Sequence, residues 1–121
     1  MAVRAIRGAT QVDSDSQDEI RTKTAELVVA VMERNELVPD DLISVIFTVT
    51  PDLAADFPAA AARKMGLDEV PLLCATEIPV PGALPRVVRL LAHLETSKPR
   101  SELRHVYLHG ATALRQDLLP Q

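Results

Sequence analysis

The stretch LISVIFTVT, residues 42–50, constrains the fold of this chain more than any other segment. It is apolar and rich in β-branched residues, it lies between Pro39 and Pro51, and it lacks the alternation of a strand with one solvated face. Such a run predicts a strand covered on both faces, and we expect it to be the central strand of a sheet. The chain of 121 residues is long enough for one core around that sheet.

An amphipathic helix is predicted ahead of this strand. Ser16 and Glu19 have the spacing of a capping box, in which each side chain satisfies a backbone amide at a helix start. From there to about Asn35, apolar residues recur on one helical face: Ile20, Leu27, Val28, Val31 and Met32. The apolar stripe of this helix needs a sheet to cover.

Local signals predict the remaining elements. Pro58 and Pro85 each suit the first turn of a helix, and Gly66 is placed to end the first of these helices. We therefore expect helices over residues 58–65 and 85–95, and strands over residues 3–8, 70–78 and 103–109. No internal repeat or second domain is visible, so we expect a single domain over residues 1–121. Residues 111–121 are its tail, ordered only against another structure.

Composition excludes several classes of function. The 17 acidic residues outnumber the 13 basic ones, and the three aromatic rings are too few to stack bases, which argues against nucleic-acid binding. No apolar run reaches the roughly 18 residues of a membrane span, and the N-terminus lacks the apolar core of a signal peptide. We expect a cytoplasmic protein that binds neither nucleic acid nor membrane.

Metal and nucleophile signatures are weak. The single cysteine, Cys74, cannot form an internal disulfide and is either a buried filler or a working thiol. His105 and His109 share one face of a predicted strand but are separated by roughly 13 Å, too far to hold one metal ion. Neither a G-x-S-x-G motif nor a glycine-rich phosphate loop is present.

Ionisable side chains inside apolar segments suggest a binding site. Arg7 shares a strand face with apolar residues, and Arg86 and Arg89 are neighbours on the predicted helix 85–95. Each of these residues also has an ordinary structural explanation, because surface arginines are usually solvated. The same holds for Cys74, since a cysteine is most often a small buried hydrophobe. Together with Glu77, Cys74 and Tyr107, however, the arginines suit a small, multiply charged, hydroxylated ligand.

The spacing of Cys74 and Glu77 adds a geometric constraint. They are three positions apart, so in a regular strand their side chains face opposite sides. One subunit cannot easily aim both at the same ligand. A site shared between subunits, or a strand that ends near Thr76, removes the conflict.

Four segments carry a resemblance to a known family. They are VRAIRGAT at the start, FTVTPDLAADFPAAAAR at 47–63, VPLLCATEIPVPGALPRVVRLL at 70–91 and RHVYLHGATALRQDL at 104–118. In this order they resemble the monofunctional, trimeric bacterial class of chorismate mutase. The resemblance implies an α+β fold, a mixed sheet flanked by helices. In this fold, three subunits pack their sheets into a barrel-like core, with an active site at each subunit interface.

The resemblance also implies a reaction and a set of residues. The reaction is the rearrangement of chorismate to prephenate in the shikimate pathway to phenylalanine and tyrosine, and it needs no metal or organic cofactor. By matching position, one subunit supplies mainly Arg7, Glu77, Arg89 and Tyr107. The neighbour supplies largely Phe57, Arg63, Leu73 and Cys74, and Leu114 and Arg115 are further substrate contacts.

The implied roles differ from residue to residue. Arg89 would act on the ether oxygen of chorismate, Arg7 and the Tyr107 region would bind one carboxylate, and Glu77 and Cys74 would engage the ring hydroxyl. Phe57 would wall the ring, and Arg63 and Arg115 would hold the second carboxylate. Two positions depart from the family pattern, since Ala60 stands where a lysine is common and Leu73 replaces a commonly polar residue.

Two rival interpretations remain open from the sequence. A non-catalytic trimeric module that binds a small anion would need the same arginines. A small trimeric imine deaminase has a related interface site, but the arginine-containing signature of that group is absent at the expected place. Catalytic turnover of chorismate separates these alternatives.

Overall fold

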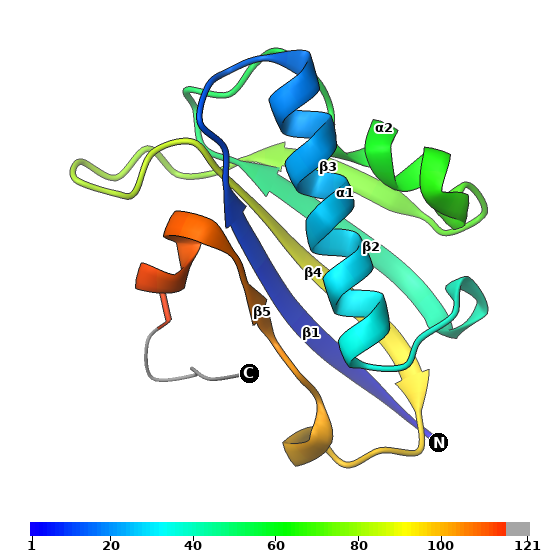
Figure 1. Ribbon diagram of the computed structural model, residues 1–121. Helices are drawn as coiled ribbons and strands as arrows, with labels where there is room; N and C mark the ends of the chain where they lie inside the picture. The colour runs from blue at the N-terminus through cyan, green and yellow to red at the C-terminus, as the bar shows by residue number, and fades with distance from the viewer. Residues whose placement is uncertain (116–121) are drawn as a thin grey trace.

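One mixed sheet organises the computed structural model, which describes residues 1–115. Its strands lie in the order β3-β2-β4-β1-β5 (Figure 1). β4 pairs antiparallel with β1 and β2, whereas β3 and β5 at the two edges pair parallel with β2 and β1. The strands are β1 (Ala2–Gln11), β2 (Leu42–Val49), β3 (Leu72–Thr76), β4 (Val87–Thr96) and β5 (Val106–Tyr107).

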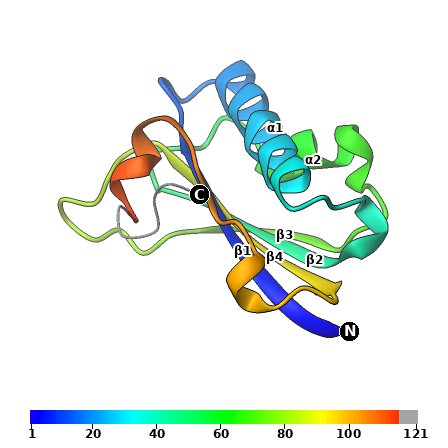
Figure 2. The same ribbon diagram turned by 60° about the horizontal axis from the view of Figure 1, so that its bottom comes forward.

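Both α-helices of the described chain cover the same face of the sheet (Figure 2). They are α1 (Gln17–Arg34) and α2 (Pro58–Ala62). The main core lies between the helices and the sheet, where Leu27 and Val31 of α1 belong to one apolar cluster with Ile6 and Leu94 of the strands. This arrangement confirms the α+β class that the resemblance implied. No helix within residues 1–115 is long and apolar enough to cross a membrane.

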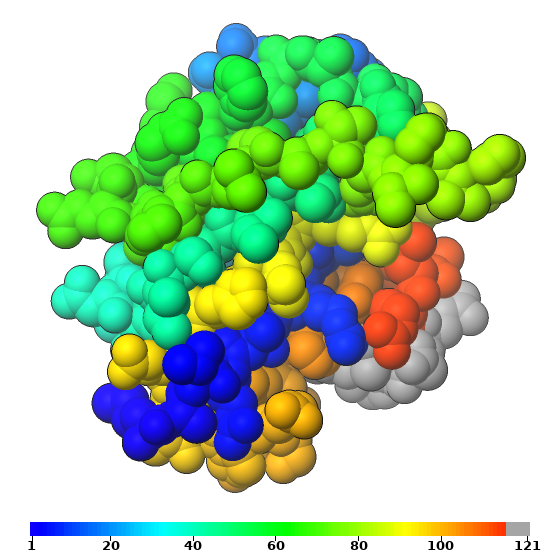
Figure 3. Space-filling model, turned by 180° about the vertical axis from the view of Figure 1, so that it is seen from behind, coloured from blue at the N-terminus to red at the C-terminus, as the bar shows by residue number. Residues whose placement is uncertain are grey.

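The opposite face of the sheet, here called the open face, has no helix over it (Figures 2 and 3). It presents apolar side chains to solvent, among them Val3 at 61% and Leu73 at 62% exposure. Leu91 and the charged Arg7 and Arg89 lie on the same face. Within the described residues, the apolar cluster of Ala9, Val87, Tyr107 and Ala111 covers one end of this face, and the rest is left without an apolar cover.

The start of α1 confirms half of the predicted capping box. Ser16 is the N-cap, and its Oγ accepts the N–H of Glu19 at 3.1 Å. The reciprocal half was wrong, because Glu19 Oε1 accepts the N–H of Asp13 at 2.8 Å instead of that of Ser16. The glutamate therefore orders the loop before the helix as well as the first helical turn.

The predicted helix over residues 85–95 was wrong, since these residues form most of β4. Val88, Leu90, Ala92 and Leu94 are all 5% exposed or less, and they alternate with the more exposed Arg89, Leu91, His93 and Glu95. This is the period of a strand with one buried face. The prediction failed because Pro85 and the three-residue spacing of Val88, Leu91 and Leu94 are also typical of a helix.

The segment 42–50 is confirmed as a strand but is not the central one, because β4 occupies that place. Nor is β2 covered on both faces within this chain, since Ile43 is 39% exposed. The irregular apolar pattern has a local cause. An irregularity in the pairing with β4, between Leu42 and Ser44, interrupts the alternation of side chains.

The remaining boundaries shift by a few residues. β1 is longer than predicted, and β3 and β5 are shorter. α2 is followed by a wider turn over Arg63–Leu67, in which Gly66 takes a φ of +100°, a conformation that favours glycine. After β5 the chain makes a short 3-10 turn over His109–Ala113. His109 therefore does not share a strand face with His105, as the sequence had suggested.

Candidate active site

A pocket of about 290 Å³ on the open face brings Arg7, Arg89 and Tyr107 together. We call it the arginine pocket, and Figure 3 looks onto the face that contains it, with β4 in yellow and β1 in blue. Its side chains come from four strands: Arg7, Gly8 and Ala9 of β1, Ile46 and Thr48 of β2, Arg89, Leu90 and Leu91 of β4, and Tyr107 of β5. Residues far apart in the chain thus meet because β4 and β1 are neighbours.

Strand register explains why the two arginines are close. In the antiparallel pair of β1 and β4, Ala9 lies opposite Arg89 and Arg7 lies opposite Leu91. Arg7 and Arg89 are therefore diagonal neighbours on one face, a relation that separates Cα atoms by roughly 7–8 Å. Two positive side chains at neighbouring positions of one face repel each other unless an anion lies between them, so the pocket favours an anionic ligand.

Glu77 lies beside Arg89 and partly balances its charge. Glu77 Oε2 is 3.0 Å from Arg89 Nε, and it also accepts a hydrogen bond of 2.6 Å from the hydroxyl of Thr48. The contact with Arg89 is an ion pair without an aligned hydrogen bond, because Nε–H finds no acceptor in good geometry within the described residues. Both contacts use the same carboxylate oxygen, Oε2. The side chain of Glu77 is only 16% exposed, so this carboxylate is held in place.

Sequence reasoning missed Thr48. It lies opposite Arg89 in the pairing of β2 with β4, lines the arginine pocket and fixes Glu77. A signal was present in the sequence, because Ser44 and Thr48 are polar and four positions apart in the otherwise apolar run 42–50. That spacing places polar groups on one strand face.

Arg86 does not join Arg89 in the pocket, so the expected pairing of these arginines was wrong. It precedes β4 at a φ of +53°, and its Nε donates to the backbone carbonyl of Val12 at 3.0 Å. Arg86 holds backbone together and is turned away from the ligand pocket.

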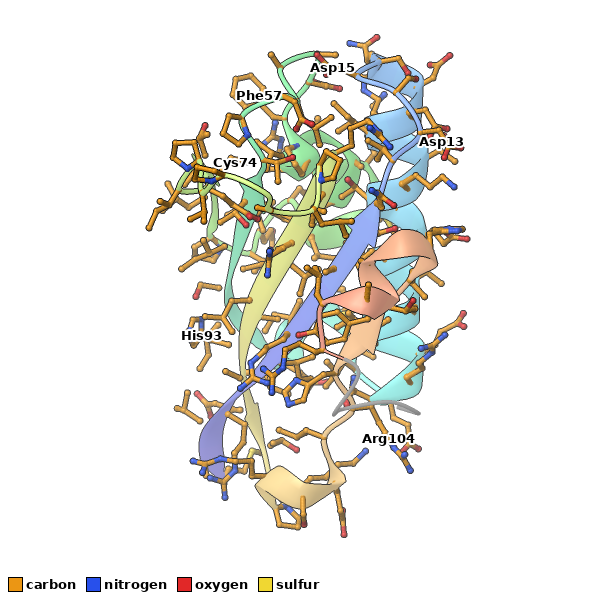
Figure 4. All side chains as sticks on the ribbon, turned by 90° about the vertical axis from the view of Figure 1, so that its left-hand side faces the viewer. Asp13, Asp15, Phe57, Cys74, His93 and Arg104 are labelled. Atoms are coloured by element: carbon orange, nitrogen blue, oxygen red, sulfur yellow. The ribbon has the colours of Figure 1, made fainter. Side chains whose placement is uncertain are left out.

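Phe57 and Cys74 line a second pocket of about 370 Å³, here called the edge pocket. It lies at the edge of the sheet where β3 approaches the start of α2, and Figure 4 shows the two labelled residues near each other. Phe57 is 67% exposed, whereas Cys74 is half-buried and packs against the main core. The edge pocket thus combines an exposed ring with a thiol.

Several charged contacts hold the loop that carries Phe57. Asp15 accepts the backbone N–H groups of Ala54 and Ala55 at 2.9 Å each, and Asp56 accepts from Arg21 and from the N–H of Phe57. Burial alone would raise the pKa of the Asp56 carboxyl. The hydrogen bonds from Arg21 and Phe57, with the charges of Arg21 and Lys64, outweigh burial and lower that pKa.

The two pockets are separate on one chain. They share no lining residue, although Thr48 of the arginine pocket lies opposite Ala75 of the edge pocket in the pairing of β2 with β3. β3 ends at Thr76, and Glu77 contacts the arginine pocket while Cys74 faces the helix side. The opposite orientation predicted from their odd spacing is therefore confirmed.

Leu73 and Arg63 join neither pocket. Leu73 lies on the open face opposite Ile46 of β2, so it points away from its neighbour Cys74. Arg63 is exposed at the end of α2, and Ala60 is half-buried within that helix. In a single copy of the chain, these residues do not reach the arginine pocket.

The segment after β5 borders the arginine pocket. Leu114 packs against an apolar cluster that contains Tyr107 and the fully buried Ala111. Burial and the positive charges of Arg7 and Arg115 lower the pKa of His105, whose Nδ1 accepts the N–H of Arg7 at 2.9 Å. The charge of Arg115 therefore acts at His105, which is bonded to the backbone of Arg7. Of the predicted tail, residues 111–121, the part from 116 onward lies outside the described residues.

Metal-ligating side chains do not gather in the described part of this chain. Within residues 1–115, no group of three His, Cys, Asp or Glu side chains is arranged to hold a metal ion. What the arrangement offers chemically is therefore a pair of cations, a fixed carboxylate, hydroxyl groups and an aromatic ring. These groups bind and polarise a ligand.

Comparison with known proteins gives a consistent result. The chain matches the family described as chorismate mutase type I over residues 3–118. It is 50% identical to chorismate mutase AroH of Thermus thermophilus and 40% identical to chorismate mutase AroH of Bacillus subtilis. These matches cover 96% and 98% of this chain, and 96% and 94% of the relatives. A solved chorismate mutase from Clostridium thermocellum superimposes with a TM-score of 0.90 at 48% identity, covering 91% of this chain and 98% of that one. The chain belongs to the chorismate mutase type I family.

Proposed function

We propose that this protein converts chorismate to prephenate in an active site that two neighbouring subunits of a homotrimer build together. As a chorismate mutase of type I, the chain is an isomerase of aromatic amino-acid biosynthesis. One observation carries the residue assignment: the diagonal pair Arg7 and Arg89 shares a pocket with Tyr107, and Glu77 is fixed against Arg89. The cytoplasmic location stays a prediction.

The reaction is unimolecular, which sets what the protein must supply. The ether C–O bond of chorismate breaks while a C–C bond forms, and no atom is gained or lost. The catalyst therefore has to hold the flexible dianion in its compact conformer and place donors where negative charge grows on the ether oxygen. We assign that oxygen to Arg89, whose Nε side is occupied by Glu77.

The other groups would bind and orient the substrate. Arg7 and Tyr107 would take one carboxylate, and the fixed Glu77 would accept from the ring hydroxyl, with Cys74 of the neighbouring subunit as a second contact. From the neighbouring subunit, Phe57 would wall the ring. The other assigned substrate contacts, at the edge of the site, are Arg63, Leu73, Leu114 and Arg115.

Two features support a trimer. The open face leaves apolar residues such as Val3 and Leu73 exposed, which is costly unless another subunit covers them. On one chain, Cys74 of the edge pocket also faces the helix side of the sheet, whereas Arg7 and Arg89 lie on the open face, so the two sets do not point at one chorismate. Bringing the arginine pocket of one copy against the edge pocket of the next gives a heterologous contact, which closes into a ring when the rotation fits.

The first experiment follows chorismate consumption by ultraviolet absorbance, with purified protein and a chelator and without added metal or cofactor. We expect rapid conversion to prephenate. A folded protein that binds chorismate without converting it would reject the mutase assignment and favour the anion-binding module. Light scattering on the same sample gives the subunit number, and a monomeric active enzyme would reject the shared site.

A mixing experiment tests the sharing directly. Arg89→Ala damages only the arginine pocket and Arg63→Ala only the neighbour's contribution, so each variant alone should be slow at low chorismate concentration. Co-refolding the two at equal amounts should restore about one quarter of wild-type activity, because about three quarters of the rings are mixed and each mixed ring contains one intact site out of three. If both halves came from the same chain, mixing would restore nothing.

The C-terminal segment is proposed to close over bound substrate. Ala111 is buried against the Tyr107 cluster, so removing everything after Gly110 would also damage the core. A cut after Arg115 leaves that contact intact. Unchanged kcat and KM after this shorter cut would confine any closing role to residues 111–115.

A further inference from the structure

The backbone at Arg86 has an unusual conformation for an arginine. Its φ is +53°, in the left-handed region that side chains with a Cβ rarely adopt. Arg86 stands immediately before β4 and three positions before Arg89. Such a strained residue persists only where its surroundings hold it, and it often lies near a functional site.

Asp52 supplies the main restraint. Its two carboxylate oxygens accept the N–H of Arg86 at 3.0 and 3.3 Å, and Oδ1 also accepts the hydroxyl hydrogen of Thr50. The Thr50 oxygen in turn accepts the N–H of Val87 at 3.0 Å, and Thr50 is only 6% exposed. The Asp52 carboxylate therefore accepts the N–H of Arg86 directly, and through the Thr50 hydroxyl it is linked to the N–H of Val87.

Arg86 is also tied to the end of β1. Its carbonyl accepts the N–H of Val12 at 2.9 Å, while its Nε donates to the carbonyl of Val12 at 3.0 Å. The backbone at Thr50 donates to the carbonyl of Val87 at 3.1 Å. The start of β4 is thus held from both neighbouring strands, and it leads into the fully buried Val87 and Val88 and then Arg89.

A pocket beside Asp52 also contains Glu77, the carboxylate that pairs with Arg89. This pocket of about 230 Å³ is lined by Thr50 and Asp52 together with Glu77 and the residues that follow it. Asp52 thus contacts the backbone that leads to Arg89, and it shares a pocket with Glu77, the residue that contacts Arg89. Loss of its carboxylate would disturb the partners relative to each other without touching the ligand.

We propose that Asp52 is a positioning residue for the arginine pocket, which holds Arg86 in its left-handed conformation and thereby sets where Arg89 lies against Glu77. This inference rests on the proposed role of Arg89 in the reaction. Asp52 itself does not line the arginine pocket. Its loss should therefore lower kcat more than it raises KM.

A double-substitution cycle tests the proposal, with D52A, R86G and the double variant D52A/R86G. Because glycine adopts positive φ without strain, R86G should need no carboxylate to hold its backbone. D52A should lower kcat by about 10-fold to 10²-fold, the range expected for a misplaced catalytic group. R86G alone should keep most of the activity, and the double variant should recover most of what D52A loses.

Two further variants keep the test clear. D41A removes a carboxylate that likewise accepts a backbone N–H, that of Val38 at 2.9 Å, at a 3-10 turn outside both pockets. It should lower the melting temperature with kcat unchanged. If D52A does not fold, D52N, which keeps one acceptor oxygen, should give a smaller loss of kcat that R86G again reverses.

The outcomes are distinct. A double variant as slow as D52A, or a D52A enzyme with wild-type kcat, would overturn the positioning role. If the wild-type protein does not convert chorismate, the proposed function fails instead. The role of Asp52 is then judged by unfolding, where strictly additive effects of D52A and R86G on stability would reject it.

Discussion

The arginine pocket and the edge pocket are built in different ways. The first stands on the middle strands of the sheet, and its key carboxylate is already fixed by Thr48 and Arg89. The second stands on a loop and an edge strand, where Phe57 leaves most of its ring in solvent. The arginine pocket is preorganised because its charged groups already have their partners. The exposed ring of Phe57 in the edge pocket is instead free to pack against a neighbouring subunit. The predictions below test this contrast.

The largest effect is expected at the arginine pocket. Arg89→Ala should lower kcat on the order of 10² or more with a smaller change in KM, because the lost donor acts on charge that develops during the reaction. Arg89→Lys should rescue poorly, since an ammonium cannot reproduce a planar fork. Steady-state kinetics decides the matter, with Arg34→Ala on the exposed end of α1 as a neutral control. A change confined to KM would remove Arg89 from the chemical step.

A smaller and different effect is expected at the edge pocket. Phe57→Ala should raise KM by about tenfold and leave kcat within a factor of a few, because the ring contributes binding in the ground and transition states alike. The melting temperature of the isolated subunit should hardly change, since the ring is 67% exposed. A loss of kcat comparable to that of Arg89→Ala would contradict the division between the pockets.

The loop beneath Phe57 should show a pH-dependent contribution to stability. The pKa of Asp56 is lowered in the folded protein, so its stabilisation is present above the unfolded pKa near 3.8 and is lost as pH falls through the folded value. Asp56→Asn should cost about 1 kcal/mol at neutral pH, since the paired Arg21 is partly exposed, and less in acid. Urea unfolding at pH 7 and pH 3 measures this, with the exposed Asp68→Asn as control. An equal loss at both pH values would argue against the charged pair.

The smallest effect concerns His105 beside the arginine pocket. Its pKa is lowered by burial, Arg7 and Arg115, so the unfolded chain binds the proton more readily and stability falls as pH drops below about 6.5. The loss should be less than about 1 kcal/mol because the ring is only half-buried. His105→Asn keeps an acceptor for the N–H of Arg7 and should flatten this slope between pH 7 and pH 5. An unchanged slope would assign it to another group.

The sequence predicted elements well where one signal dominated. The cap at Ser16 defined α1, and the β-branched run defined β2. Residues 85–95 failed because Val88, Leu91 and Leu94 fit a helix, while the equally regular burial of Val88, Leu90, Ala92 and Leu94 marks a strand. Helical and strand periods coincide over short apolar runs, and only pairing with β1 and β2 decides between them.

Local sequence signals were likewise not enough to assemble the candidate site. Family resemblance selected Arg7, Glu77 and Arg89, and their proximity follows from strand register that no local pattern contains. Thr48 escaped because its importance depends on lying opposite Arg89. Asp52 escaped because a backbone conformation at Arg86 is invisible in the sequence. Side chains that act through a neighbour therefore need the fold before they can be recognised.

The pairing of β1 also governs when the arginine pocket forms as the chain is made. β1 pairs only with β4 and β5 among the described strands, and its first residue, Ala2, lies opposite Thr96. At about 5–20 residues per second, the ribosome needs several seconds to deliver that partner. α1 and β2 are synthesised before then, so β1 has neither of its strand partners until β4 emerges. Arg7 and Arg89 can meet only after β4 has been synthesised, so the arginine pocket forms late in synthesis.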